Sequence, residues 1–265
     1  MPVYLFALSQ HSQPELWKLT LSFCIIHFLL YPASNGFNSY YDRDEGSIGG
    51  LKDPPPVKND LLYTSLALDA LAIALGFIIS PQFSLMLFIY GLVSKAYSHP
   101  AIRLKKYAIP AWLTAGIFQG GFTYCMVLQG LNDLIFTDQH LIATLLSTLM
   151  ILGFYPLTQI YQHDEDKKRG DITISYLAGI RGTFILSGLV FTVAFAGFGY
   201  FFYLYYGLEF FGLFMLFLSP ALLYFLWWAG KCWRNPLAAS YKPAMHMNLS
   251  GSMTLSLFFL YLFLR

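Results

Sequence analysis

The sequence predicts an all-α fold, a polytopic membrane bundle of about eight transmembrane helices around a central cavity. Composition is the first reason, because 57% of the 265 residues are hydrophobic and only 11% are charged. Soluble domains usually carry about 25% charged residues, so this deficit and the mean hydropathy of +0.55 indicate an integral membrane protein. The second reason is a series of long apolar runs, and the third is an alternation of charge between the loops that join them.

The apolar runs account for the predicted helices one by one. A helix needs roughly 20 apolar residues to cross the hydrocarbon core, and about eight segments approach that length. They are expected near Trp17–Tyr41, Leu61–Ile79, Phe83–Ser98, Ile109–Leu128, Leu141–Tyr161, Thr183–Tyr203, Phe210–Trp233 and Met245–Leu264. Pro32, Pro110, Pro156 and Pro220 fall in or beside these segments, where membrane helices tolerate kinks.

Lysine and arginine occupy alternate loops. The loops after the second, fourth and sixth spans contain neither residue. Arg43, Lys52 and Lys58 follow the first span, and Lys95, Arg103, Lys105 and Lys106 follow or end the third. Lys167, Lys168, Arg169 and Arg181 follow the fifth span, and Lys231, Arg234 and Lys242 follow or end the seventh. Because positive charge stays on the cytoplasmic side, we expect the odd-numbered loops in the cytoplasm and the protein in the cell inner membrane.

Other classes of protein fit this sequence less well. A net charge of +2 is too small to indicate nucleic-acid binding. Cys24, Cys125 and Cys232 lie in separate apolar stretches and are expected as free thiols. Met1–Gln10 is apolar but too short to span, and it lacks the basic flank of a signal peptide. We expect one integral membrane domain over residues 1–265, and the sequence indicates no particular oligomeric state.

Polar residues gather at the end of the first span. Asn35, Asn38 and Asp42 occur at i, i+3 and i+7, so they line one stripe of a helix, and Asp44 and Glu45 follow in the loop. Mg²⁺ prefers oxygen ligands and usually combines one or two carboxylates with substrate phosphates. The cluster is therefore either half of such a site or a solvated helix end, and the long loop after it is either an ordered cap or a mobile lid.

A similar cluster follows the fifth span. Gln162 and Asp166 are four residues apart, on one face of a helix end. Further charges lie close by in the sequence, at Asp164, Glu165, Lys167, Lys168, Arg169 and Asp171. Gly170 is expected to form a tight turn and Thr173 to cap the next helix. On its own this segment is equally a charged juxtamembrane loop, but two such clusters on one membrane face are expected to meet across the central cavity.

The third polar stretch ends the third span, from Tyr97 to Lys106. Its side chains Arg103, Lys105 and Lys106 are suited to neutralising a diphosphate, because guanidinium and ammonium groups donate charge-assisted hydrogen bonds to phosphate oxygens. The alternative is that they serve only as a positive-inside topology signal.

Two charges, Asp69 and Lys95, fall inside or near the ends of spans. Charge inside a membrane is costly and is usually paired or functional. These two residues are therefore expected either to pair with each other or, for Lys95, to reach the cytoplasmic cavity. Aromatic residues make up 18% of the chain. Most of them are expected to pack or to face lipid, and some to line a cavity, where aromatic faces stabilise cations.

These motifs together resemble the UbiA-type intramembrane prenyltransferase superfamily, over almost the whole chain. That family has an Asn-x-x-x-Asp-x-x-x-Asp motif, and Asn38 and Asp42 match its first two positions, while Gly46 stands at the third. The family also has a later Asp-x-x-x-Asp motif, in which Asp166 matches the second position and Gln162 stands at the first.

Two flanking features extend the resemblance, and two features depart from it. Gly170 and Thr173 match the family's Gly-x-x-Thr, and residues 97–105 are similar to its Tyr-Ser-x-Pro-Pro-x-x-Leu-Lys stretch, with Ala101 at the second proline. The family norm is nine helices, with the first motif after the second helix, so the chain looks as if one N-terminal helix is absent. We expect either that Met1–Gln10 is its remnant or that the true start lies upstream of Met1. Each motif also lacks one carboxylate, for which the neighbouring acidic residues Asp44, Glu45, Asp164 or Glu165 are candidate substitutes.

The resemblance implies a Mg²⁺-dependent enzyme that transfers a prenyl group from a polyprenyl diphosphate to an aromatic or other lipophilic acceptor within the membrane. It places catalytic roles on Asn38, Asp42, Asp166, Arg103 and Lys105. It makes Asn38, Asp42, Asp164 and Asp166 metal ligands, and it makes Asn35, Arg43, Tyr97, Gln162 and Lys167 contacts of the diphosphate.

Two alternatives stay open at this point. A UbiA-type terpene cyclase would use the same ionisation but would form product without an added acceptor. A non-catalytic lipid-binding or transport homologue would bind prenyl diphosphate and leave it unaltered. One fold hosts several chemistries, so fold alone does not separate these classes.

Overall fold

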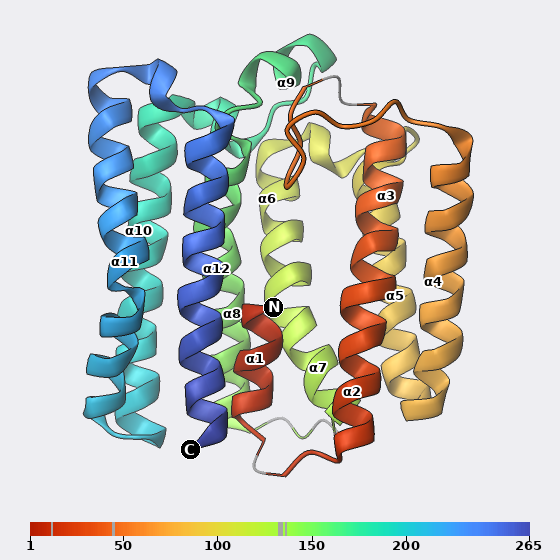
Figure 1. Cartoon of the computed structure of the whole chain (residues 1–265), viewed down its shortest axis with the longest axis vertical. Coiled ribbons are helices and arrows are strands. Elements are labelled where there is room, and N and C mark those ends of the chain that lie inside the picture. Colours follow the sequence, from red (N-terminus) through yellow and green to blue (C-terminus); the bar gives the residue numbers. More distant parts are fainter. Residues whose placement is uncertain (12, 44–45, 132–134, 136) are drawn as a thin grey trace. The chain divides into compact units, whose positions relative to one another are not determined.

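Helices make up nearly all of this computed structural model, which describes residues 1–11, 13–43, 46–131, 135 and 137–265 (Figure 1). In those ranges the only β contact is one antiparallel bridge, between Ile48 and Leu51 in the loop after the first span. The all-α prediction is therefore confirmed. The chain divides into two compact units, which are described in turn.

Seven helical segments of the described chain are long and apolar enough to cross a membrane. They are Leu16–Asp42, Asn59–Ile79, Ala108–Leu131, Asp138–Gln159, Ile174–Tyr205, Leu208–Arg234 and Tyr241–Leu264. Each coincides with a predicted span. The remaining predicted span, the third (Phe83–Ser98), forms helix α5 (Pro81–Ser98), whose 18 residues include Lys95 and which is not among the seven. All the predicted segments are thus helical.

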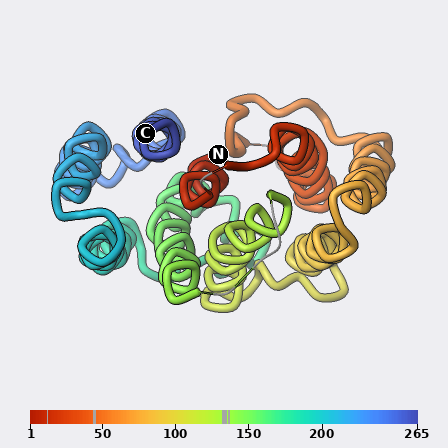
Figure 2. The backbone as a smooth tube through the Cα atoms, turned by 90° about the horizontal axis from the view of Figure 1, so that it is seen from below, coloured from red at the N-terminus to blue at the C-terminus, as the bar shows by residue number. Residues whose placement is uncertain are grey.

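The unit formed by His11–Lys105 and Cys125–Ile135 contains the first three spans. The first span is one continuous helix made of α2 (Leu16–Cys24), the π-helix η1 (Ile25–Leu30) and α3 (Tyr31–Asp42). It packs with α4 (Asn59–Ile79) and α5, which run side by side with α3 in Figures 1 and 2. Gly36 permits the close approach of α3 to α4, because a Cβ there would lie 2.4 Å from the Ser65 hydroxyl oxygen.

The other unit is formed by Met1–Gln10, Lys106–Tyr124 and Phe136–Arg265. Its helices are α1 (Pro2–Ser9), α6 (Ala108–Gly116), the π-helix η3 (Ile117–Phe122), the start of α7 (Thr123–Leu131), α8 (Asp138–Gln159), α9 (His163–Arg169), α10 (Ile174–Tyr205), α11 (Leu208–Arg234), η4 (Pro236–Ala238) and α12 (Tyr241–Leu264). Figures 1 and 2 show α10, α11 and α12 side by side, and α10 also packs along α8.

Residues Pro2–Ser9, within the expected remnant of a helix, fold as the short helix α1. This helix is apolar on every side, and such a helix is stable only when it is buried. It packs against α12, and Phe6 is fully buried. The Phe6 ring stacks on that of Phe259, with centroids 4.5 Å apart, and meets that of Tyr124 at a tilt, with centroids 5.4 Å apart.

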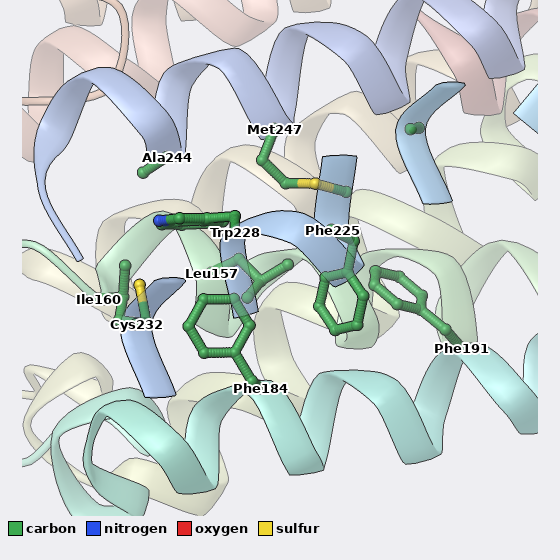
Figure 3. Close-up of a cluster of buried hydrophobic side chains, with 10 residues drawn as sticks. Leu157, Ile160, Phe184, Phe191, Phe225, Trp228, Cys232, Ala244 and Met247 are labelled. Atoms are coloured by element: carbon green, nitrogen blue, oxygen red, sulfur yellow. The ribbon is translucent and has the colours of Figure 1, made fainter. Parts of the chain in front are cut away.

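The interior of this unit is aromatic where α8, α10, α11 and α12 meet (Figure 3). Trp228 of α11 is fully buried, and Phe184 of α10 meets it edge to face with ring centroids 5.0 Å apart. The indole Nε1 of Trp228 donates to the carbonyl of Ala238, at 3.0 Å. The one polar atom of this large side chain is therefore satisfied, as burial requires.

Prolines and helix irregularities coincide only in part: the π-helix η1 ends two residues before Pro32, but other prolines lie in regular helix. Pro156 and Pro220 lie inside α8 and α11, which continue through them. The break in α10 comes instead at Gly179, whose φ of 69° and ψ of 173° are strained for any residue with a side chain. Two π-helices, η1 and η3, interrupt two other spans.

At Gly120 the backbone of η3 lies very close to the backbone of α8. A Cβ on Gly120 would lie 2.5 Å from the Ser147 carbonyl oxygen and 2.7 Å from the Thr148 Cα. Both atoms belong to backbone, so they have no side-chain freedom with which to move aside. Gly212 of α11 is a matched contrast, because a Cβ there would meet nothing within 4 Å.

We therefore expect Gly120→Ala to lower the free energy of unfolding by about 1–3 kcal/mol, the usual cost of overpacking. Gly212→Ala should be neutral or stabilising by up to ~1 kcal/mol, because alanine is the better helix former. The measurement is the thermal unfolding midpoint of each purified variant in detergent. Equal midpoints for the two variants would show that η3 and α8 are not in close contact.

Candidate functional site

The first predicted cluster lies at the end of α3. The helix ends at Asp42, because Arg43 adopts left-handed angles (φ 47°, ψ 47°) and its N–H closes the last turn on the Ser39 carbonyl. Asn38 and Asp42 are half-buried and one helical turn apart, while Asn35 is exposed. The Oδ1 atom of Asn38 is buried and makes no hydrogen bond to any described residue. An amide oxygen in that state is ready to accept from a ligand or bind a cation.

Lys105 closes onto Asp42 in a buried ion pair. The two side chains are only 10% and 12% exposed, although they lie 63 residues apart in the chain. Lys105 is presented by the short 3₁₀ helix η2 (Leu104–Lys106), which follows a turn at Arg103 with φ of 47°. The structure thus brings together a carboxylate from the first polar stretch and an amine from the third.

The other candidates in this unit occupy the same segments. Tyr97 is half-buried near the end of α5. The ring of Tyr41 meets that of His99 at 5.1 Å, which joins the end of α3 to the segment that carries Arg103 and Lys105. Arg43 is exposed, and its guanidinium lies 6.0 Å from the centre of the Tyr40 ring.

The second predicted cluster forms the short helix α9 (His163–Arg169). Gln162 is its N-cap, and the Gln162 carbonyl accepts from the Asp166 N–H at 2.9 Å, so the two residues are one turn apart as predicted. Asp164 and Lys167 are exposed, and Asp166 is half-buried. The acidic first turn and basic last turn of α9 complement the helix dipole, so part of this charge pattern stabilises the helix itself.

Thr173 joins Asp166 to the start of α10. Its hydroxyl donates to Asp166 Oδ2 at 2.8 Å and accepts from the Tyr176 N–H at 3.2 Å, as an N-cap does. Gly170 ends α9 with φ of 70°. The predicted turn at Gly170 and the predicted cap at Thr173 are both confirmed.

A hydrogen-bonded chain next to this cluster was not predicted. His163 Nε2 lies 2.8 Å from the Ser175 hydroxyl, which lies 2.9 Å from the Thr183 hydroxyl. Thr183 also donates to the carbonyl of Gly179, at the break in α10. Burial lowers the pKa of His163, and the neighbouring Asp164 carboxylate opposes that shift. Single polar residues spaced along a chain give no periodic signal, so only the fold reveals this contact of α9 with α10.

The donors in the two clusters fit a metal ion only in part. No group of three or more His, Cys, Asp or Glu side chains comes together within the described ranges. Each cluster offers an amide and a carboxylate, and Asn38 Oδ1 and Glu165 Oε2 are buried without hydrogen-bond partners. Mg²⁺ usually takes one or two carboxylates and completes its shell with water and substrate phosphates, so each cluster fits half of such a site.

Two expectations about the clusters stay predictions. Asp44 and Glu45, the candidate substitutes for the lost carboxylate of the first motif, lie outside the described residues. The first cluster belongs to one compact unit and the second to the other, so their meeting across a central cavity is also still a prediction.

The fold and its apolar helices define an integral membrane protein. The UbiA prenyltransferase family matches residues 1–252 of the sequence. The chain therefore belongs to the UbiA prenyltransferase family. A search of curated proteins by sequence found no match.

Solved structures of UbiA homologues are similar to the whole chain. The apo structure of a homologue from Aeropyrum pernix K1 is 18% identical, with a TM-score of 0.71 over 97% of this chain and 94% of that one. A homologue from Archaeoglobus fulgidus bound to DMAPP and Mg²⁺ is 13% identical, with a TM-score of 0.68 over 99% and 93%. A structure of digeranylgeranylglyceryl phosphate synthase is 18% identical, with a TM-score of 0.63 over 100% and 92%. At these identities the likeness shows the fold.

The two hydrogen bonds of Thr173 make a testable pair of substitutions. Thr173→Val keeps the shape but removes the cap and the donor to Asp166, so it should cost about 1–2 kcal/mol of stability, as lost caps do. Thr173→Ser keeps the hydroxyl and should stay close to the parent protein. Thermal unfolding in detergent measures both, and a parent-like midpoint for Thr173→Val beside a lowered midpoint for Thr173→Ser would mean that the methyl group, not the hydroxyl, matters.

Proposed function

We propose that this protein is a prenyltransferase that moves a prenyl group from a polyprenyl diphosphate to an aromatic or other lipophilic acceptor within the membrane. The observation that carries the proposal is the ion pair of Asp42 with Lys105, one helical turn from the buried Oδ1 of Asn38, unpartnered among the described residues, in a chain of the UbiA family. The carboxylate and the amide suit a metal ion, and the ammonium group suits a diphosphate. A fold neighbour bound to DMAPP and Mg²⁺ supports the same class of ligand.

Asn38, Asp42 and Asp166 are the proposed metal ligands, with Asp164 and Gln162 assisting. Mg²⁺ supplies positive charge that offsets the charge growing on the diphosphate. The buried Oδ1 of Asn38 needs no rearrangement to become a ligand, because no described residue hydrogen-bonds it. Thr173 orients the Asp166 carboxylate by donating to one of its oxygens.

Cationic side chains bind the diphosphate in this proposal. Lys105 neutralises Asp42 in the ligand-free protein. In the proposed complex its ammonium group would donate to a phosphate oxygen, either together with Asp42 or in its place. Arg103 and Arg43 are placed by turns next to Lys105 and Asp42 respectively. The remaining proposed contacts of the diphosphate are Asn35, Tyr97, Gln162 and Lys167.

The reaction requires one bond to break and one to form. The bond between the prenyl C1 and the diphosphate oxygen breaks, and its electron pair leaves with the diphosphate, so an allylic cation remains. Fixed positive charge around the diphosphate favours this ionisation. The acceptor then supplies the electron pair of the new bond and releases a proton. The apolar spans suit a donor and an acceptor that dissolve in the bilayer. We further propose that the site faces the cytoplasm across the cell inner membrane, from the alternation of charge in the loops.

The test is turnover by Asp42→Ala in membranes supplied with Mg²⁺, labelled prenyl diphosphates of several lengths and a panel of acceptors. We expect a loss of about 100-fold or more, the usual effect of removing a group that stabilises developing charge. Asp53→Asn, in the exposed loop before α4, is the matched control and should keep its activity. Undiminished turnover by Asp42→Ala would reject this site assignment.

The same assay separates the proposed transferase from the two other classes. A prenylated acceptor that forms only when acceptor is supplied is the expected product. A cyclic hydrocarbon or alcohol formed without acceptor would instead indicate a terpene cyclase. Donor that binds with measurable affinity but is recovered unaltered would indicate a non-catalytic homologue.

A further inference from the structure

A second ion pair joins α4 to α5, in the same unit as α3. Asp69, in the middle of α4, accepts from the ammonium group of Lys95, near the end of α5. The Asp69 side chain is only 8% exposed, and its second oxygen, Oδ1, is buried without a hydrogen-bond partner. The pairing predicted from the two intramembrane charges is therefore confirmed.

The pair lies where three helices converge. The Lys95 ammonium is 5.4 Å from the centre of the Phe37 ring of α3, and it also donates weakly to the Gly91 carbonyl at 3.4 Å. Phe37 is itself buried. One turn along α4 from Asp69, Ser65 lies against Gly36, the residue just before Phe37. The cation thus contacts α4 through Asp69, α3 through Phe37, and its own helix α5.

Stability alone does not explain this arrangement. Removing two charges from water costs about as much as their attraction returns, so a buried ion pair gives little net stability compared with apolar residues. Charges inside a membrane are rare for that reason and usually serve a function. The pair instead fixes the rotation of α3 about its axis, because the Lys95 ammonium group binds the aromatic ring of Phe37 on one side of that helix.

That face is adjacent to the proposed metal ligands. Phe37 immediately precedes Asn38, and side chains of neighbouring helical residues point about 100° apart, following from 3.6 residues per turn. Any rotation of α3 about its axis that moves Phe37 off Lys95 therefore turns Asn38 and Asp42 by the same angle. Metal sites need their ligands held within roughly 0.5 Å, so such a rotation would weaken the site.

We propose that the Asp69–Lys95 pair is a positioning element that sets the rotation of α3 through Phe37, and so aims Asn38 and Asp42 at the metal and diphosphate. This inference rests on the proposed function of that site. Asp69 and Lys95 do not touch the ligand. They act through Phe37, so losing them weakens metal binding and slows turnover without unfolding the protein.

The decisive variants separate two effects, the loss of the orientation of α3 and the penalty of leaving a buried charge unpaired. Lys95→Met alone leaves the Asp69 carboxylate buried and unpaired, which is expected to destabilise the protein. The double variant Asp69→Asn/Lys95→Met removes both charges and avoids that penalty. Phe37→Leu removes the ring over the ammonium, together with its contact with Tyr41, and creates no unpaired charge, so it is informative even if the double variant does not fold. Lys95→Arg and Phe37→Tyr keep a cation over an aromatic ring and are the conservative rescues.

The readout is binding of Mn²⁺, a paramagnetic substitute for Mg²⁺, to the purified full chain with inorganic diphosphate, followed by electron paramagnetic resonance. Thermal midpoints, kcat and KM are measured on the same samples. The matched control is Glu15→Gln/Lys18→Met, which removes an exposed ion pair of the same unit. That control should bind Mn²⁺ like the parent protein.

We expect the double variant and Phe37→Leu to keep a cooperative unfolding transition but to weaken Mn²⁺ binding about tenfold, a change of ~1.4 kcal/mol. The Mg²⁺ concentration for half-maximal turnover should rise in parallel, and kcat should fall, while Lys95→Arg and Phe37→Tyr stay near the parent. Parent-like Mn²⁺ binding in Phe37→Leu, or in a folded double variant, would overturn the inference. If Asp42→Ala also binds Mn²⁺ and turns over normally, the proposed function fails instead, so the two failures are distinguishable.

Discussion

A charge in the apolar interior of a membrane protein has no water to solvate it, and this constraint shapes the unit that carries the first motif. Asp42 and Asp69 are both nearly buried there, and each holds a lysine from the segment around α5. One ion pair joins the consecutive helices α4 and α5, and the other joins the end of α3 to the segment after α5. Pairing these charges therefore also fixes how α3, α4 and the end of α5 pack.

Sequence periodicity and composition were enough to predict the helices. Each long apolar run became a helix, since a span must satisfy its backbone hydrogen bonds within itself. The break at Gly179 and the two π-helices were not predicted, because such irregularities leave the length and the apolar composition of a span unchanged. Whether residues 1–265 act as one domain is still a prediction.

For the candidate site, local features were predicted and long-range contacts mostly were not. The turn at Gly170 and the cap at Thr173 follow from the conformations that these two residues favour, and the structure has both. The pairing of Asp69 with Lys95 was predicted because an unpaired charge is untenable in a span. The pairing of Asp42 with Lys105 was not, since both residues had plausible roles at a water-exposed helix end and no short-range pattern joins them.

Lys105 serves Asp42 as an internal counter-ion, and this separates two events that many metalloproteins combine. Where a metal supplies the charge balance of buried carboxylates, as in small metal-dependent domains, folding and metal uptake are one transition. Here the ammonium group supplies that balance from within the chain. With the metal site proposed above, the protein would complete its insertion and packing in the bilayer before it binds metal, and a cell short of divalent cations would hold a folded protein without its metal instead of a misfolded one.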